Sequence, residues 1–167
     1  LREDRRHISD DDISRLRAEI HVPLNLEMAA TEEMLDISLS HAPHAACIVP
    51  EKREERTTEG GLDAIKGSNH LEPYVAALLA KNIRVALFVE PDPTQLDAAK
   101  LLGVSVIELH TGAFCNTHGQ ARAQELSRIQ RAAAHAASIG LECHAGHGLG
   151  FETVTTIAGI PEIVELN

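Results

Sequence analysis

The amino-acid sequence predicts an α/β fold, and within that class a (β/α)8 TIM barrel of which these 167 residues form a part. Short apolar segments alternate with helical patterns along the chain, which is typical of a parallel sheet covered by helices. Asn25 and Glu27 share one face of a predicted strand, as do Glu108 and His110 of a later one, because strand side chains alternate with a period of two. A doubly wound sheet has helices on both faces, whereas the upper interior of a barrel opens on a site formed by its loops. These polar pairs therefore favour the barrel.

Helix-capping signals mark several of the connections between the predicted strands. Ser9 followed by Asp12 resembles a capping box, which predicts a helix that begins there. Thr31 is the expected cap of a second helix, because the glutamates that follow it suit the positive end of a helix dipole. Asp92 is the expected N-cap of another helix, with Pro93 at its first position.

The remaining elements follow from hydrophobic periodicity. Pro73 is compatible with the helix around residues 71–79 only near its first turn. The expected strands are residues 24–29, 45–49, 83–89, 104–111, 141–145 and a cut strand at 163–167. Further helices are expected at 93–102, before Gly140 and at 151–158, with a loop from 112 to 119.

The two ends of the chain predict that it is a piece of a longer protein. A dense polar run follows Leu1 at once, and residues 163–167 stop within a predicted strand. Five of the predicted strands are complete and two are cut, one before the amino-terminal polar run and one at residues 163–167. We therefore expect one partial barrel domain over residues 1–167, which lacks the first strand-helix unit and the carboxyl-terminal end.

Composition restricts the possible partners and the compartment. Asp and Glu total 25 against 15 Lys and Arg, which gives a net charge of −10 and disfavours nucleic acid and anionic membranes as partners. An anionic ligand therefore needs a local focus of cationic groups or backbone N–H groups. The three cysteines, Cys47, Cys115 and Cys143, show no disulfide pattern, and the sequence contains no membrane segment or signal peptide. These features predict a cytoplasmic protein.

The densest polar stretch is residues 49–63, which read VPEKREERTTEGGLD. A connection this long is more often functional than a typical link of about 4–6 residues. We interpret it as a lid or binding loop in which Gly60 with Gly61 provides a hinge. The alternative is a solvated surface loop.

Polar residues recur where the predicted strands end, so a barrel brings them together at one mouth. Glu27 and His147 are the natural acid–base pair, because a partly desolvated carboxylate and imidazole can exchange protons near neutral pH. The alternatives are a salt-bridged strand glutamate and a loop histidine between glycines. The full set is Glu27, Glu51 with Lys52 and Arg53, Glu90 with Asp92, Glu108 with His110 and Thr111, and His144 with His147.

Two further motifs suggest ligand binding. The glycine-rich turn at residues 146–150 follows a strand, so its N–H groups could hold a phosphate; its match to a dinucleotide fingerprint is weak. The run of Arg2, Arg5, Arg6 and His7 is either a solvated charge run or an anion clamp. A metal site is a further alternative, with His110, His144 and His147 as its ligands.

Five motifs, taken together and in this order, resemble the pyridoxine 5′-phosphate synthase family over the whole chain. They are LREDRRHI, NLEMA with TEEML, VPEKR with TTEGGLD, ELHTG, and AGHGL. The resemblance implies a (β/α)8 barrel that condenses 3-amino-2-oxopropyl phosphate with 1-deoxy-D-xylulose 5-phosphate and releases phosphate and water. It also implies that no metal or organic cofactor takes part, and that barrels assemble as a homo-octamer.

The resemblance also implies roles for individual residues. Glu27 resembles the proton-accepting base, His147 the proton donor and Glu108 the group that stabilises the transition state. The positions that bind deoxyxylulose phosphate match Arg2, His7 and Thr57, and a contact to the aminoketone phosphate matches Gly148.

This chain also departs from the family pattern. The family has a catalytic histidine immediately before the position of Leu1 and a phosphate-binding Gly-His pair after the position of Asn167. We therefore expect the 167-residue chain to be inactive by itself. The competing functions are a metal-dependent barrel hydrolase or aldolase, and a non-catalytic truncated homologue.

Overall fold

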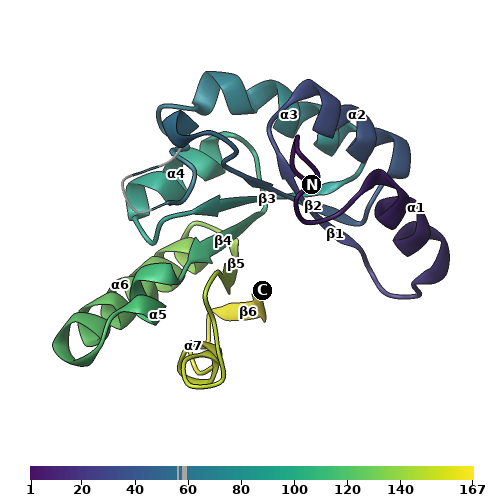
Figure 1. Cartoon of the computed structure of the whole chain (residues 1–167). Coiled ribbons are helices and arrows are strands. Elements are labelled where there is room, and N and C mark those ends of the chain that lie inside the picture. Colours follow the sequence, from purple (N-terminus) through teal and green to yellow (C-terminus); the bar gives the residue numbers. More distant parts are fainter. Residues whose placement is uncertain (56, 58–59) are drawn as a thin grey trace.

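The computed structural model describes residues 1–55, 57 and 60–167. Within these residues, six parallel strands form one sheet in the order β1-β2-β3-β4-β5-β6. The sheet curves, and the helices lie along its outer side (Figure 1). The strands are β1 (Asn25–Ala29), β2 (Ala45–Val49), β3 (Arg84–Val89), β4 (Val106–His110), β5 (Glu142–Gly146) and β6 (Ile163–Leu166). The parallel order confirms the predicted barrel-like α/β fold.

Helices connect successive strands, and their caps confirm several of the predictions. Ser9 and Asp12 form a complete capping box, Thr31 accepts a hydrogen bond from the N–H of Met34, and Asp92 accepts one from Thr94. The helices are α1 (Asp10–Glu19), α2 (Glu32–His41), the 3-10 turn η1 (Arg53–Glu55), α3 (Ser68–Ala80), α4 (Pro93–Leu101), α5 (Gly112–Asn116), α6 (Gly119–Ser138) and α7 (Val154–Ala158).

Two local expectations were wrong. Helix α5 occupies most of the segment expected to be a loop, because Phe114 is buried beneath it against the core. Helix α3 begins at Ser68, so Pro73 lies inside the helix, beyond the first turn. Proline supplies no N–H to the helix, but burial of Leu71 and Val75 on the same helix offsets that loss.

Alternation along the strands separates an apolar outer face from a mixed inner face. The outer side chains of β2 to β4, such as Ile48, Leu87 and Ile107, belong to the main core beneath the helices. A smaller inner cluster contains Cys47, Val49, Ala86, Phe88 and Val106. Cys47 and Cys143 are both buried in strands, with free thiols.

The strand register fixes the level of each inner side chain. Glu27 pairs with Cys47 across β1 and β2, and Glu108 pairs with both Phe88 and His144 across β3 to β5. His110 lies two residues further along β4, opposite Gly146. Polar groups at the carboxyl ends of these strands are therefore presented on one side of the sheet.

We expect the outer core to carry most of the stability of this chain. Ile107 is fully buried, so Ile107→Ala should lower the free energy of unfolding by about 2–5 kcal/mol through lost burial and a residual cavity. Leu101→Ala is the matched control, because that side chain is 88% exposed and should change the free energy by less than about 0.5 kcal/mol. Urea unfolding measures both, and equal effects of the two substitutions would contradict this assignment of the core.

Candidate active site

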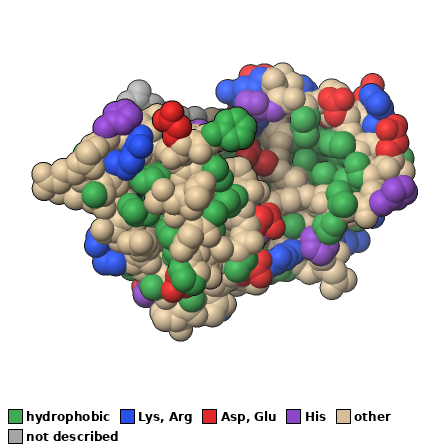
Figure 2. All heavy atoms as spheres, turned by 90° about the horizontal axis from the view of Figure 1, so that it is seen from below, with side chains coloured by type: hydrophobic (Ala, Val, Ile, Leu, Met, Phe, Trp, Pro, Cys, Tyr) green, Lys and Arg blue, Asp and Glu red, His purple; other side chains and the backbone are tan. Residues whose placement is uncertain are grey.

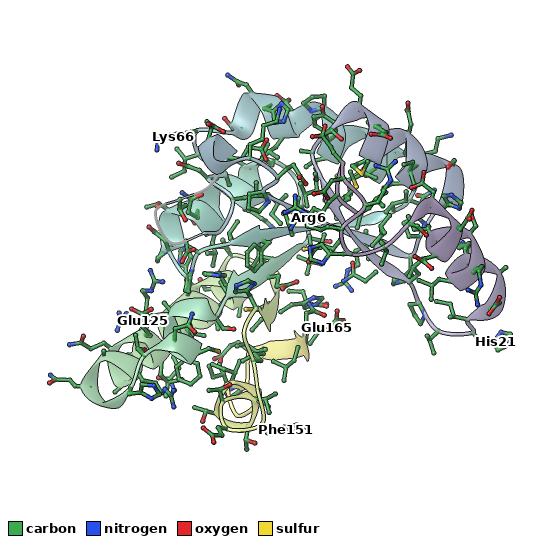
Figure 3. The ribbon with its side chains drawn as sticks, in the orientation of Figure 1. Arg6, His21, Lys66, Glu125, Phe151 and Glu165 are labelled. Atoms are coloured by element: carbon green, nitrogen blue, oxygen red, sulfur yellow. The ribbon has the colours of Figure 1, made fainter. Side chains whose placement is uncertain are left out.

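A cavity of about 500 Å³ lies on the inner side of the sheet, at the carboxyl ends of its strands. Viewed from below, acidic and histidine side chains are visible in the hollow between two lobes of the surface (Figure 2). Arg6 and Glu165, which Figure 3 labels, lie on either side of the open inner side of the sheet, and neither of them lines this cavity. Five of the seven site residues predicted from the sequence line the cavity: Arg2, Glu27, Glu108, His147 and Gly148. The fold therefore brings together residues that are up to 146 positions apart, from Arg2 to Gly148.

Arg2 holds the amino-terminal segment against the cavity. Its Nη1 donates a hydrogen bond of 2.7 Å to the carbonyl of Pro50 and lies 3.5 Å from Oε2 of Glu51. Its Nη2 lies 3.4 Å from Oε1 of Glu27, whose side chain is half-exposed. The guanidinium thus lies between two carboxylates, one of which, Glu27, is open to the cavity.

The neighbouring arginines of the amino-terminal run are already paired. Arg5 donates to Asp10 at 2.7 Å and to Glu33 at 2.6 Å, and Arg6 pairs with Asp4 and Glu51. Of the predicted run, Arg2 is the arginine that lines the cavity.

Glu108 is the most buried carboxylate that lines the cavity, with 7% of the residue exposed. Its Oε2 accepts a hydrogen bond of 2.8 Å from Nδ2 of Asn167 and faces the thiol of Cys47 at 3.7 Å. Burial raises the pKa of Glu108 above its ordinary value, although the hydrogen bond from Asn167 opposes this shift. The carboxyl group is therefore better able to retain a proton than an exposed glutamate.

His147 lies directly after β5, in a left-handed backbone conformation with φ of 78°, and Gly148 follows with φ of 81°. A left-handed φ is unfavourable for a residue with a side chain. The Thr111 hydroxyl stabilises the turn by donating to the carbonyls of Gly146 at 2.8 Å and His147 at 2.7 Å. The turn directs the imidazole towards His110, whose ring centroid is 4.8 Å away.

The surroundings of His147 favour its neutral form. Burial lowers the pKa of the imidazole, and His110 lowers it further, whereas the negative charge of Glu27 raises it. Glu27 and His147 line the same cavity, and their role as an acid–base pair stays a prediction.

The other two predicted residues lie outside this cavity. His7 lines an adjacent cavity of about 590 Å³, which shares Arg2, Glu27 and His147 with the first. The Thr57 hydroxyl lies 3.4 Å from Oε1 of Glu90, and the Thr57 N–H donates to the carbonyl of Gly61 at 2.9 Å. The expectation of a lid also involves Arg56, Thr58 and Glu59, which lie outside the described residues.

The three histidines considered as metal ligands do not converge. His144 lies lower on the sheet, where its Nε2 is 2.8 Å from Glu142 and its Nδ1 is 3.4 Å from Glu165. His110 and His147 face one another at the upper edge. In the part of the chain that the structure describes, no three His, Cys, Asp or Glu side chains form a group that could hold a metal ion.

Sequence reasoning missed three contributors to the cavity. Phe88 belongs to a run that is apolar throughout, Asn167 is the last residue of the chain, and Gly60 was considered only as a hinge. The period-two pattern of β3 places Phe88 on the inner face and is a signal that could have identified it. No comparable sequence pattern predicts the strand register that brings Asn167 to Glu108.

Parallel strands that carry carboxylates and imidazoles to one end of the sheet, around a cavity, define a barrel-type enzyme site. The chain belongs to the family described as pyridoxal phosphate biosynthesis protein PdxJ, whose model matches residues 1–167. This match confirms the family resemblance of the sequence motifs.

Two relatives agree with this membership. The chain is 64% identical to the pyridoxine 5′-phosphate synthase of Rhodospirillum rubrum, and the alignment covers 100% of the chain and 68% of the relative. It is 62% identical to the synthase of Zymomonas mobilis, of which it covers 65%, with 100% of the chain aligned. The chain thus spans about two thirds of the length of these relatives.

A crystal structure of the Amycolatopsis orientalis BexX/CysO complex matches 100% of this chain and 66% of the solved chain, with a TM-score of 0.64 and 13% identity. At that identity the likeness shows the fold alone.

In the described ranges, no helix is both long and apolar enough to cross a membrane.

The fit between β4 and β5 requires glycine at position 146. A Cβ atom at Gly146 would overlap Oε1 of Glu108 and lie 3.1 Å from Cβ of Asn167. We expect Gly146→Ala to displace the Glu108 carboxyl group and to lower the free energy of unfolding by about 1–3 kcal/mol. Gly150→Ala is the control, because a Cβ there meets open space. Urea unfolding that fails to distinguish the two variants would argue against this packing.

His147 should titrate below its ordinary pKa of 6.5, which NMR of the imidazole can measure directly. Because the folded state disfavours the charged ring, the stability gained from the neutral form is present above pH 6.5 and is lost as the pH falls through the folded pKa. His147→Asn should remove this part of the pH dependence of stability. A midpoint above 6.5 would refute the electrostatic description.

Proposed function

We propose that this chain is the partial barrel domain, over residues 1–167, of a pyridoxine 5′-phosphate synthase. The enzyme would condense 3-amino-2-oxopropyl phosphate with 1-deoxy-D-xylulose 5-phosphate to pyridoxine 5′-phosphate, with release of phosphate and water. The observation that carries this proposal is that Glu27, Glu108 and His147 line one cavity in a chain that matches the PdxJ family along its whole length.

The chemistry needs protons to move between positioned groups. An amine and a ketone condense with loss of water, and the later eliminations and ring closure require a base on one side and an acid on the other. Glu27, half-exposed at the cavity, is the base that accepts a proton from the substrate, and His147 is the group that returns one. Their placement in one cavity supports both roles.

Glu108 acts differently from this pair. Its burial and its raised pKa suit a carboxyl group that donates or shares a hydrogen bond with charge that develops on the substrate. Asn167 fixes the orientation of the carboxyl group through Oε2. We therefore assign to Glu108 the stabilisation of the transition state.

Substrate phosphates require a local cationic focus in a chain of net charge −10. Arg2, His7 and Thr57 are proposed to bind deoxyxylulose phosphate, and the backbone at Gly148 to contact the aminoketone phosphate. The two cavities share Arg2 with Glu27 and His147, which supports binding of two substrates beside one pair of proton-transfer groups.

Properties of the whole protein belong to the same proposal and rest on the family resemblance. They are a transferase-type condensation without a metal or organic cofactor, assembly as a homo-octamer and a cytoplasmic location. We also propose that the 167-residue chain alone is inactive, because it spans about two thirds of the length of its relatives.

The test is a turnover assay with both substrates in a protein of the relatives' length that contains this sequence. Glu27→Gln and His147→Asn should each reduce kcat by about 100-fold or more with little change in KM, because general acid–base transfer contributes on that scale. Thr57→Val should instead weaken binding of deoxyxylulose phosphate. Glu72→Gln and His21→Asn, on exposed sites elsewhere, are the matched controls.

Each outcome of the assay has a definite meaning. Product formation by the wild-type protein, with the expected separation of kcat and KM effects, supports the function and the roles. Losses confined to KM in the Glu27 and His147 variants would contradict proton transfer by these residues. Substantial product formation by the 167-residue chain would overturn the expectation that it is inactive alone.

A further inference from the structure

A buried group of side chains connects the loop after β2 to His147. Its two central members are Glu90 and His110, and the proposed function gives a role to neither. Glu90 follows β3 directly and is 4% exposed, and His110 ends β4 and is 7% exposed. We propose that Glu90 and His110 are positioning residues. Through them, the orientation of the His147 ring depends on how the loop at Gly61 lies against the sheet. This inference rests on the proposed function of the same site.

The carboxylate of Glu90 is held from two directions. Nη2 of Arg128, on α6, lies 3.1 Å from Oε2. The N–H of Gly61 donates to Oε1 at 2.9 Å, and the hydroxyl of Thr57 lies 3.4 Å from the same oxygen. Gly61 also has no room for a side chain, because a Cβ atom would lie 2.7 Å from the backbone nitrogen of Glu90. Glu90 therefore fixes this loop to the sheet, together with the backbone hydrogen bond from Leu62 to Phe88.

The same carboxylate oxygen faces His110. Nδ1 of His110 lies 3.1 Å from Oε1 of Glu90, and this buried nitrogen has no aligned hydrogen-bond partner among the described residues. A carboxylate beside one ring nitrogen of a histidine favours the tautomer that carries a proton there. Glu90 thus favours a proton on Nδ1 of His110, and Nε2 lies on the side of the cavity.

The ring of His110 is packed against the ring of His147. Phe88 closes one side in a T-shaped contact with His110, with ring centroids 5.1 Å apart and planes at 87°. Gly112 closes another, since a Cβ atom there would lie 2.9 Å from Nε2 of His110 and 3.1 Å from Cδ2 of His147. A rotation of His110 would therefore press on His147, whose own backbone is held in a left-handed turn.

These contacts link the loop and the imidazole through one shared acceptor. Gly61 and Thr57 reach Oε1 of Glu90 from the loop, and His110 reaches it from β4. The position of the loop at Thr57 and Gly61 is therefore coupled to Oε1 of Glu90, the atom that His110 faces, and through His110 to the packing of the His147 ring.

The test combines NMR of the histidine rings with kinetics. In the 167-residue chain, Glu90→Gln keeps the shape of Glu90 but removes its charge, and His110→Asn keeps a nitrogen donor near the position of Nδ1 but removes the ring. We expect both variants to change the imidazole chemical shifts of His147 and to move its titration midpoint by about half a pH unit or more. Glu90 faces His110, Glu27 acts on the charge of His147, and Arg128 pairs with Glu90.

A matched control is available on the surface of the same chain. Asp97 and His135 form a carboxylate–imidazole pair at 2.7 Å between α4 and α6, outside the cavity. Asp97→Asn breaks a pair of the same chemistry and should leave the signals of His147 unchanged.

The kinetic arm uses a protein of the relatives' length that contains this sequence. Glu90→Gln and His110→Asn should lower kcat by about 10–100-fold with KM within a few-fold of the wild type, as for other groups that orient a functional histidine. The pH profile of kcat should shift in the same direction as the NMR midpoint of His147. Circular dichroism shows that each variant is folded, and if Glu90→Gln fails to fold, His110→Asn decides the outcome.

The possible results separate the two proposals. Unchanged His147 signals in a folded variant overturn the positioning role, whatever the kinetics show. Altered signals with unchanged kcat also overturn it. If the wild-type protein forms no product, the proposed function fails, and the NMR comparison with Asp97→Asn still decides whether Glu90 and His110 place the ring of His147.

Discussion

The structure depends on one constraint, the alternation of strand side chains across a parallel register. Every second residue of β2 to β4 faces the helices and is apolar, which supplies the burial that holds the sheet and the helices together. The residues between them face inwards, where the register sets Glu108 level with Phe88 and His144. A shift of one residue in any strand would exchange these two sets and remove both the core and the site.

The inner face carries an electrostatic cost that its packing offsets. Glu108 and Glu90 are buried, and a carboxylate leaves water at a cost unless it is paired or protonated. Arg128 and the amide of Gly61 compensate Glu90, whereas Asn167 and the thiol of Cys47 surround Glu108. The two carboxyl groups thus have different surroundings. Glu90, directly after β3, faces the cation of Arg128, whereas burial raises the pKa of Glu108 on β4.

The long charged loop has a narrower part in the site than its composition suggested. The groups proposed to transfer protons lie on β1 and in the turn after β5, and the loop contributes Gly60 to the cavity and two donors to Glu90. Glycine is required at position 61 because the loop backbone lies directly against the end of β3. The loop is thus joined to the sheet by close backbone contact, which its sequence of charges does not reveal.

The sequence by itself determined the alternation of elements, the N-caps of α1, α2 and α4, and the inner placement of Glu27, Glu108 and His110, because propensity, capping and strand period act over a few residues. Motif similarity identified the family and, with it, the residues proposed to react. Only the tertiary structure decided the side-chain partnerships. The Asn167 contact to Glu108, the Glu90 contact to His110 and the left-handed turn at His147 depend on register and packing between distant segments. Pro73 within α3 shows the same limit, because the burial of its helix outweighed a local rule.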